Sequence, residues 1–433
     1  MNVIRYGNAQ VELLHRSLDV TRVGCKFSRV RSIERQHYLG RAARAIVNGK
    51  LGHASSTDSL TDDRLVQRAI AVAQVDVPST LTFPEATLAV DAVNATLAGM
   101  PDSDLCALAE DILHGIGQGR PEIAIELEVR RMGETIQLHN SRGGQYALSR
   151  AWLEGEAWIE RHSGSDVLVV QDTFASARVD AHGGHREFAR RMARRLRWAK
   201  REVRPKPGAQ SVILSPGAFS SLLRPMLLRL NGAQAFQDGS RGSKRQSGLA
   251  WKVGNPIFDP RFSLYDDATL ADRPRSAPVD HEGTPGQRTA LIERGTLKGF
   301  YYDLHSAALA ETRSTGNGWR VLMEPPHPTP TNVVIGTGDT SLTEMVKRLK
   351  DGLLIDMVMS SDSAASLQGD FARTVVMAYP IKNGRIAGFV KGIGIGGNLY
   401  RALQSIEALS CDGYWAGDIF APYLQIGGVT VTV

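Results

Sequence analysis

The sequence has few cysteines, few aromatic residues and no long apolar run. Only three of its 433 residues are cysteine, Cys25, Cys106 and Cys411, and they lie far apart. This spacing excludes a disulfide framework and a Cys-x-x-Cys metal knuckle, and it favours a reducing cytoplasm. No run approaches the roughly 20 apolar residues of a membrane-spanning helix, and the opening stretch MNVIRYGNAQ has no hydrophobic signal region. We therefore expect a cytoplasmic protein without a membrane partner.

The remaining composition is that of a globular protein, with 42% hydrophobic and 22% charged residues. The net charge of +6 is concentrated in residues 186–201, REFARRMARRLRWAKR. Apolar side chains recur there at helical spacing, at Phe188, Met192, Leu196 and Ala199, which predicts an amphipathic helix with a basic outer face. Such a face can bind nucleic acid or simply be solvated. No interleaved aromatic residues or recognised nucleic-acid module accompany it, which favours the solvated face.

Turn and periodicity signals divide the chain into three sections and predict an α+β fold. Section 1–85 is an N-terminal α/β domain with an amphipathic helix, then two strands paired across Asn48-Gly49. A further helix is capped by Ser59 or Thr61. Section 86–205 has a helix near 102–116, a strand, a turn at Gly133-Glu134, and two strands joined at Gly143-Gly144. The basic helix and a linker at 205–208 end that section, and section 206–433 is a strand-rich C-terminal domain.

Two motifs suggest chemistry that their surroundings do not support. His281-Glu282 is half of a zinc-peptidase signature, but the second histidine would fall at Pro285 or Gly286, and this stretch cannot hold a helix. It predicts a turn, a strand at 288–292, a tight turn at Arg294-Gly295 and a strand at 297–302. The glycines at 392, 394 and 397 match a dinucleotide-binding pattern, but too few residues follow to complete that fold. They predict a junction between a strand at 386–390 and a helix at 399–409.

Several longer blocks resemble the TldD/PmbA family, whose members are described as modulators of DNA gyrase. The blocks are NGKLGHASSTDSL (48–60), VDHEGTPGQRTALIERGTLKGFYYD (279–303), RSTGNGWR (313–320), the segment LQGDFARTVVMAYPIKNGRIAGFVKGIGIGGNLYRAL (367–403) and YLQIGGVTV (423–431). The resemblance spans nearly the whole length. It implies a TldD/PmbA-like fold, with the N-terminal α/β section followed by the large strand-rich domain.

The family has two branches, and the resemblance assigns this chain to one of them. The TldD-like subunit carries a helical His-Glu-x-x-x-His motif and a distal cysteine that bind zinc, whereas the TldE/PmbA-like subunit lacks them. The matching stretch here, SVILSPGAFSSLLRPMLLRLNG (211–232), contains no His and no Glu. Cys411 lies near the position of the zinc cysteine, but one thiolate without the histidines cannot hold zinc usefully. The resemblance thus implies a TldE/PmbA-like subunit with no catalytic residues and no metal ligands of its own.

This assignment implies partners and site residues. The expected partner is a TldD-like, zinc-binding subunit, in a heterodimer or larger cytosolic complex that trims peptides and modified-peptide precursors. Candidates for lining its peptide chamber or the subunit interface are Asp280, Glu282, Gly283, Arg288 and Asn317. A stand-alone, peptide-binding homodimer and a nucleic-acid or gyrase-associated regulator remain alternatives. The residues Ala372-Arg373-Thr374 depart from the family's usual Ser-x-Gly pattern after Gly369-Asp370-Phe371, which leaves the substrate open.

Overall fold

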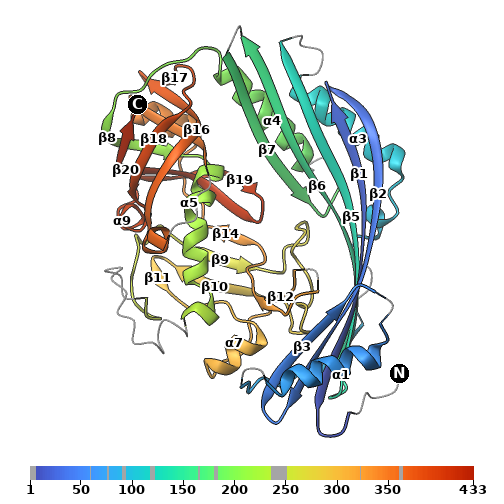
Figure 1. The fold of residues 1–433 in the computed structure, drawn as a ribbon. Helices are drawn as coiled ribbons and strands as arrows, with labels where there is room; N and C mark the ends of the chain where they lie inside the picture. Colours follow the sequence, from blue (N-terminus) through green and yellow to red (C-terminus); the bar gives the residue numbers. More distant parts are fainter. Residues whose placement is uncertain are drawn as a thin grey trace.

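The N-terminal part is one twisted, mostly antiparallel sheet of long strands (Figure 1). The computed structural model describes residues 6–58, 60–75, 78–89, 94–117, 122–163, 166–179, 184–235, 251–321, 323–359 and 364–433. The strand order is β3-β2-β1-β5-β6-β4, and β7 pairs with β6. The strands are β1 (Gln10–Lys26), β2 (Arg29–Val47), β3 (Lys50–Ser56), β4 (Thr87–Ala89), β5 (Ile123–Asn140), β6 (Gln145–Ser163) and β7 (Asp166–Ser176).

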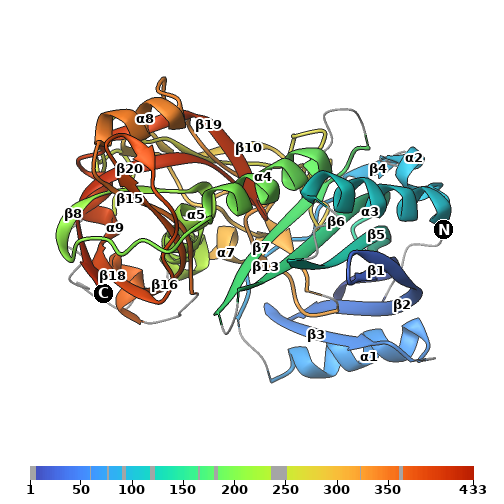
Figure 2. The same ribbon diagram turned by 90° about the horizontal axis from the view of Figure 1, so that it is seen from above.

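Helices cover this sheet in two places. Helix α1 (Asp62–Ala73) packs on β2 and β3, and Thr61 caps it as predicted; Ser59 lies outside the described residues. Helices α3 (Asp102–Ile116) and α4 (Gly184–Trp198) lie side by side near the other end of the sheet (Figure 2), and the short α2 (Ala95–Ala98) contacts β6. The basic stretch is therefore a helix, and its predicted apolar positions Phe188, Met192, Leu196 and Ala199 are all buried.

Two expectations for this part are corrected. The predicted N-terminal helix is wrong, because β1 pairs with both β2 and β5 along almost its whole length, and this pairing overrides the local periodicity. The turn at Gly133-Glu134 is also wrong, since both residues lie inside β5, opposite Asp19 and Leu18 of β1. The pairing of β1 with β5 places strands from sections 1–85 and 86–205 in one sheet. The hairpins at Asn48-Gly49 and Gly143-Gly144 are confirmed.

The C-terminal part is built on a larger mixed sheet, ordered β11-β10-β9-β14-β20-β18-β16-β15-β8. Strand β8 also pairs with β20, so that the strands from β20 to β8 close into a ring. Its strands are β8 (Gly208–Leu214), β9 (Leu264–Asp267), β10 (Arg288–Glu293), β11 (Thr296–Leu297), β14 (Val333–Ile335), β15 (Gly352–Val358), β16 (Asp370–Lys382), β17 (Arg385–Ile386), β18 (Ile393–Asn398), β19 (Ala408–Ala416) and β20 (Ile419–Thr432). A separate small pair joins β12 (Gly318–Trp319) and β13 (His327–Pro328).

The helices of this part are short, apart from α5 (Pro216–Arg229), which packs on β20 and β15. The others are α7 (Leu304–Leu309), α8 (Leu342–Leu349), the 3₁₀ helix η1 (Ala364–Gln368) and α9 (Leu399–Leu403). The predicted strand at 288–292 is confirmed as β10. The predicted strands at 297–302 and 386–390 are shorter than expected, because β11 and β17 each contribute two residues. The predicted junction is wrong in part, because the glycines at 394 and 397 lie inside β18 and do not connect a strand at 386–390 to the helix. The helix begins at Leu399 as predicted, but it ends at Leu403.

The two parts share a hydrophobic core, which makes them one folded unit. One core lies wholly within the C-terminal part, whereas a second combines α3, α4 and the N-terminal strands with Tyr379, Tyr414 and Tyr423 of the C-terminal sheet. The α+β class predicted from the sequence is confirmed. Among the described residues, we find no helix with the length and apolarity needed to cross a membrane.

Candidate functional site

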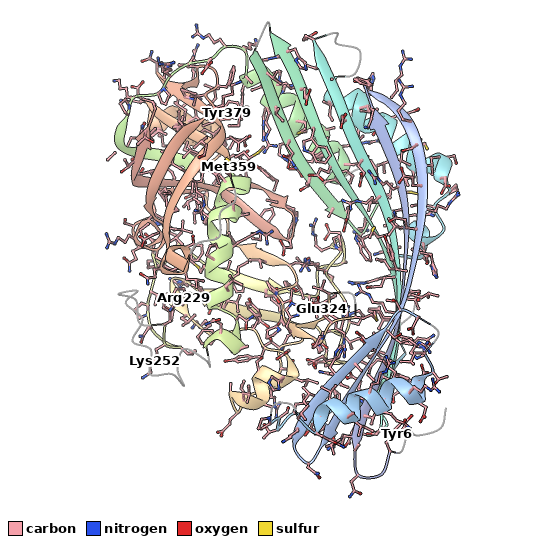
Figure 3. All side chains as sticks on the ribbon, in the orientation of Figure 1. Tyr6, Arg229, Lys252, Glu324, Met359 and Tyr379 are labelled. Carbon is pink, nitrogen blue, oxygen red and sulfur yellow. The ribbon has the colours of Figure 1, made fainter. Side chains whose placement is uncertain are left out.

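A cleft of about 500 Å³ lies between the N-terminal sheet and the C-terminal part. Figure 3 shows side chains from both walls extending into the space between them. Strands β1, β5, β6 and β7 form one wall. The other consists of α5, the loop before β10, the β12 segment and the turn between β19 and β20. Seven arginines line the cleft: Arg16, Arg130 and Arg150 from the sheet, and Arg224, Arg273, Arg275 and Arg320 from the C-terminal part.

Carboxylates in the walls are shared between pairs of these arginines. Glu134 accepts hydrogen bonds from Arg16 Nε (2.7 Å) and Arg150 Nε (2.6 Å). Burial opposes its ionisation, yet the Arg150 guanidinium lowers the pKa of Glu134 to about 2. Asp418 likewise lies 2.6 Å from Arg224 Nη2 and 3.8 Å from Arg275 Nη1. Each carboxylate neutralises one of its two guanidinium groups, so each pair keeps a positive charge.

Arg273 has a different environment, in which no carboxylate lies within ion-pair distance among the described residues. It donates to the main-chain oxygens of Ala175 (2.8 Å) and Gly417 (3.0 Å), and its guanidinium lies 3.9 Å from the Trp415 ring centroid. Burial lowers the pKa of Arg273 to about 10, so it is still charged at neutral pH. Arg150 stacks between Trp152 and Trp319, with its guanidinium carbon 5.1 and 5.0 Å from their ring centroids.

Behind the cleft, a buried charge cluster joins the two parts of the chain. Arg44 of β2 donates Nε (2.8 Å) and Nη2 (2.7 Å) to Glu12 of β1, and Nη1 (2.5 Å) to Glu282. Arg320 also donates to Glu12. All four side chains are at least 96% buried, and the cluster has no net formal charge. Burial raises the pKa of Glu282 above its usual value, and Arg44 partly offsets this effect. Because its charges come from both parts of the chain, the cluster fixes one part against the other.

The loop that carries Asp280 and Glu282 is held by its own polar side chains. Asp280 Oδ1 accepts from the amides of Glu282 and Thr284, both at 2.9 Å, and Oδ2 accepts from the Gly318 amide at 2.8 Å. Glu282 Oε2 accepts from the Leu304 amide at 2.7 Å. These carboxylates therefore fix a turn at residues 281–282, in place of the helix that a zinc-peptidase half-site requires.

His281, between these two acids, turns toward the cleft. Its ring lies 4.4 Å from the Trp319 ring centroid, and its Nδ1 accepts from the Arg320 amide at 3.1 Å. The proton of the neutral ring must then be on Nε2. Burial lowers the pKa of His281 well below its usual value, so the ring stays neutral. His281, which only matches half of a zinc-peptidase signature in sequence, is thus a packed, neutral side chain in the cleft wall.

The five residues expected to line a chamber or interface do not line this cleft. Asp280, Glu282, Gly283 and Asn317 are buried inside the chain, and Asn317 donates to Asp266 at 2.6 Å. Arg288 is exposed and lies over the Tyr265 ring, 4.2 Å from its centroid. Their role at an interface stays a prediction, while their immediate neighbours His281, Trp319 and Arg320 do reach the cleft.

Sequence reasoning missed the arginine cleft and the two arginines that α4 buries. The arginines of the cleft come from segments between Arg16 and Arg320, so no local pattern marks them. On α4, Arg191 and Arg195 are buried, whereas Arg186, Arg190 and Arg197 are exposed, so the helix keeps a basic outer face and buries two further arginines. The two buried arginines lie within 2.8 Å of Asp172, because the sheet and the C-terminal part enclose this side of the helix.

The donor set on α5 does not fit zinc. Residues 211–232, which the resemblance aligned with the zinc helix, form β8 and α5 as expected for a strand followed by a helix. The helix contains no His, Cys, Asp or Glu; Arg224 points to Asp418, and Arg229 lies over the Trp251 ring. Cys411 is exposed and contacts Asp412. No three His, Cys, Asp or Glu side chains gather as a metal site in the part of the chain that the structure describes.

Comparison with known proteins gives one family model and several relatives that cover different shares of the chain. The PmbA/TldA metallopeptidase C-terminal domain matches residues 207–433, just over half of the chain. The metalloprotease TldD homologue of Buchnera aphidicola is 30% identical over 40% of this chain and 36% of its own length. The metalloprotease PmbA of Escherichia coli is 24% identical over 87% of this chain and 83% of its own. In the strongest alignments, the chain spans half or less of the relative's length.

The fold is also found in a solved structure. The structure of TldE from Thermococcus kodakarensis superposes with a TM-score of 0.85, covering 98% of this chain and 97% of that one, at 22% identity. This likeness shows a common fold over both the N-terminal sheet and the C-terminal part. Together with the match over residues 207–433, it leads to one conclusion: the chain belongs to the TldD/PmbA family of metalloprotease-like proteins.

Proposed function

We propose that this chain is the TldE/PmbA-like, non-catalytic subunit of a heteromeric metallopeptidase, in which a TldD-like subunit holds the zinc. The observation that supports this role is the composition of α5. In the TldD-like branch the corresponding helix supplies two histidines and a glutamate, whereas here it directs Arg224 toward the cleft. A guanidinium is a cation without a lone pair for a metal, so it can neither bind zinc nor act as a general base at neutral pH.

The buried acidic groups behind the cleft are also poor candidates for a general base. Glu282 and Glu12 are engaged with Arg44, and Glu134 is engaged with Arg16 and Arg150. A general base must reach the proton that it removes, and a buried, doubly paired carboxylate does not. The proposed contribution of this chain is structural: a rigid wall that helps to enclose and bind the peptide while the partner performs hydrolysis.

The assembly would act in the cytoplasm on unstructured peptides and modified-peptide precursors. The three free cysteines of this chain suit a reducing compartment. This substrate class and location rest on the family resemblance. The buried carboxylates of this chain are paired with arginines, so the chain would bind the substrate without taking part in its hydrolysis.

Reconstitution tests the proposal. The chain is co-expressed with a TldD-like subunit that carries His-Glu-x-x-x-His, and the purified pair is assayed on an unstructured peptide. We expect a stable complex, zinc in proportion to the TldD-like subunit, and hydrolysis that a chelator abolishes. Each subunit alone serves as the control.

Two results would count against this role. Robust, chelator-insensitive cleavage by the isolated chain would place chemistry in this subunit. A chain that forms a homodimer by light scattering, and that neither binds nor stimulates any TldD-like subunit, would favour the stand-alone peptide-binding protein instead.

A further inference from the structure

Five residues of the cleft wall have a buried nitrogen donor with no hydrogen-bond partner among the described residues. One of these donors, Arg130 Nε, lies 3.2 Å from a carboxylate oxygen of Glu128, and the other four have no ion-pair partner either within the described chain. These four atoms are Arg273 Nε, Arg320 Nη1, Trp319 Nε1 and, in the tautomer set by Arg320, His281 Nε2. The side chains of Arg273, Arg320 and His281 are all more than nine-tenths buried. An unpaired buried donor costs roughly 1–3 kcal/mol, so four beside one cleft require an explanation. All four are donors, and what they lack is an acceptor.

The charge of the wall indicates the same kind of ligand. Arg16 and Arg150 share Glu134, and Arg224 and Arg275 share Asp418, so each pair keeps a positive charge. Arg273 has no carboxylate partner within the described chain. Two further acids line the cleft: Glu154 accepts from Trp152 Nε1 at 2.9 Å and lies 3.9 Å from Arg130 Nη2, and Glu156 accepts from Gln171 Nε2 at 2.9 Å. With Asp418 they make three lining acids against seven lining arginines. The wall therefore offers surplus guanidinium groups at several points of one cavity.

We propose that this cleft binds carboxylates of a peptide, from acidic side chains or from its free C-terminus. Guanidinium groups form paired, charge-assisted hydrogen bonds with carboxylates, and the tryptophan rings beside Arg150 and His281 provide apolar contact for the rest of the peptide. A volume of about 500 Å³ falls in the range of sites that enclose a small ligand or a short chain segment. That the ligand is a peptide rests on the proposed function, whereas its anionic chemistry rests on the cleft.

The test is calorimetric titration of the isolated full-length chain with unlabelled, unstructured peptides. One peptide carries three consecutive glutamates and another carries glutamines in their place, each with a free or an amidated C-terminus. We expect tighter binding, by about tenfold or more, for the peptides that keep the relevant carboxylate. If affinity falls when glutamine replaces glutamate, the cleft binds acidic side chains. If affinity falls when the C-terminus is amidated, the cleft binds the terminal carboxylate. Binding should weaken as the salt concentration rises, because the cleft is open to solvent.

Variants of the Asp418 pair sharpen the test, because both of its arginines are about half exposed and tolerate substitution. Arg224→Gln or Arg275→Gln leaves a neutral pair and should weaken binding about tenfold. Asp418→Asn removes the shared negative charge and should tighten binding, an effect that a purely structural role would not produce. The control is Arg348→Gln, an exposed arginine of α8 that lies outside the cleft and pairs with Glu344; it should leave the affinity unchanged.

Equal affinity for all four peptides, or no binding by any of them, would overturn the proposal. An equal loss in the Arg348→Gln control would also overturn it, because the attraction would then be a property of the whole surface. No TldD-like subunit is present in these titrations. Carboxylate binding without any reconstituted hydrolysis would therefore contradict the proposed function and leave the cleft assignment standing.

Discussion

Replacing Glu282 by glutamine tests whether this residue is a structural anion or a catalytic base. Its Oε1 lies 2.5 Å from Arg44 Nη1, its Oε2 accepts from the Leu304 amide, and its side chain is fully buried. The variant keeps the size of the side chain and one acceptor oxygen. It removes one negative charge from a cluster in which Arg44 and Arg320 balance Glu12 and Glu282, and so leaves an uncompensated buried cation.

The size of the effect follows from that geometry. Removing one partner of a buried ion pair costs about 3–5 kcal/mol of folding stability. Because glutamine keeps one acceptor oxygen, we expect Glu282→Gln to cost about 3 kcal/mol, at the lower end of this range. Unfolding entropy of about 2.1 cal/mol/K per residue gives roughly 0.9 kcal/mol/K for a chain of this length if it unfolds as one unit. We therefore expect the melting temperature to fall by about 3 °C.

The assay combines calorimetric melting of the isolated chain with peptide turnover by the reconstituted complex. The matched control is Glu293→Gln on β10, where the carboxylate is exposed and lies 3.6 Å from Lys298. Exposed pairs contribute about 0–1 kcal/mol, so this variant should melt within about 1 °C of the wild type. Turnover by assembled Glu282→Gln complex should persist.

The opposite pattern would refute the reasoning. If Glu282→Gln melted like the wild type and assembled normally, but its complex lost three or more orders of magnitude in turnover, the loss would lie in the chemical step. Glu282 would then be a general base, and this chain would supply chemistry.

Three further predictions concern metal, pH and backbone packing. The purified chain should contain no stoichiometric zinc by elemental analysis; about one tightly held zinc per chain would contradict the absence of a donor set on α5. Burial raises the pKa of Asp266 to about 7, so between pH of about 4 and 7 the folded chain holds a proton that the unfolded chain has released. The free energy of unfolding should therefore fall as pH rises through this window, by up to about 4 kcal/mol from this group. Asp266→Asn should flatten that slope in denaturant titrations, and an unchanged slope would disprove the assignment. A Cβ at Gly286 would lie 2.3 Å from the main-chain oxygen of Ala277, so Gly286→Ala should cost about 1–3 kcal/mol. In the same denaturant assay, the comparison is Gly299→Ala, because a Cβ at Gly299 would meet no atom closer than 3.9 Å and that backbone has no positive φ; equal losses in the two variants would show that the close contact at Gly286 is not the cause.

The sequence by itself determined the features whose causes lie within a few residues. Thr61 caps α1, the apolar positions of α4 repeat at helical spacing, and Asn48-Gly49 closes a hairpin, because capping, periodicity and turn geometry are local. The sequence blocks that resemble the TldD/PmbA family also predicted the overall fold and the strand-rich C-terminal domain. The sequence also showed that the stretch 211–232 lacks His and Glu, which carries the proposed subunit role.

Only the tertiary structure decided which charges meet. Arg44 and Glu282 are 238 positions apart and form a buried pair, and Arg16 and Asp418 line one cleft from opposite ends of the chain. Strand β1 became a strand, although its local pattern predicted a helix, because β2 and β5 supply hydrogen-bond partners on both sides. Arg191 and Arg195 were buried by the packing of α4 between the sheet and the C-terminal part. Such contacts depend on the distance between segments in space, and the order of residues along the chain does not record that distance.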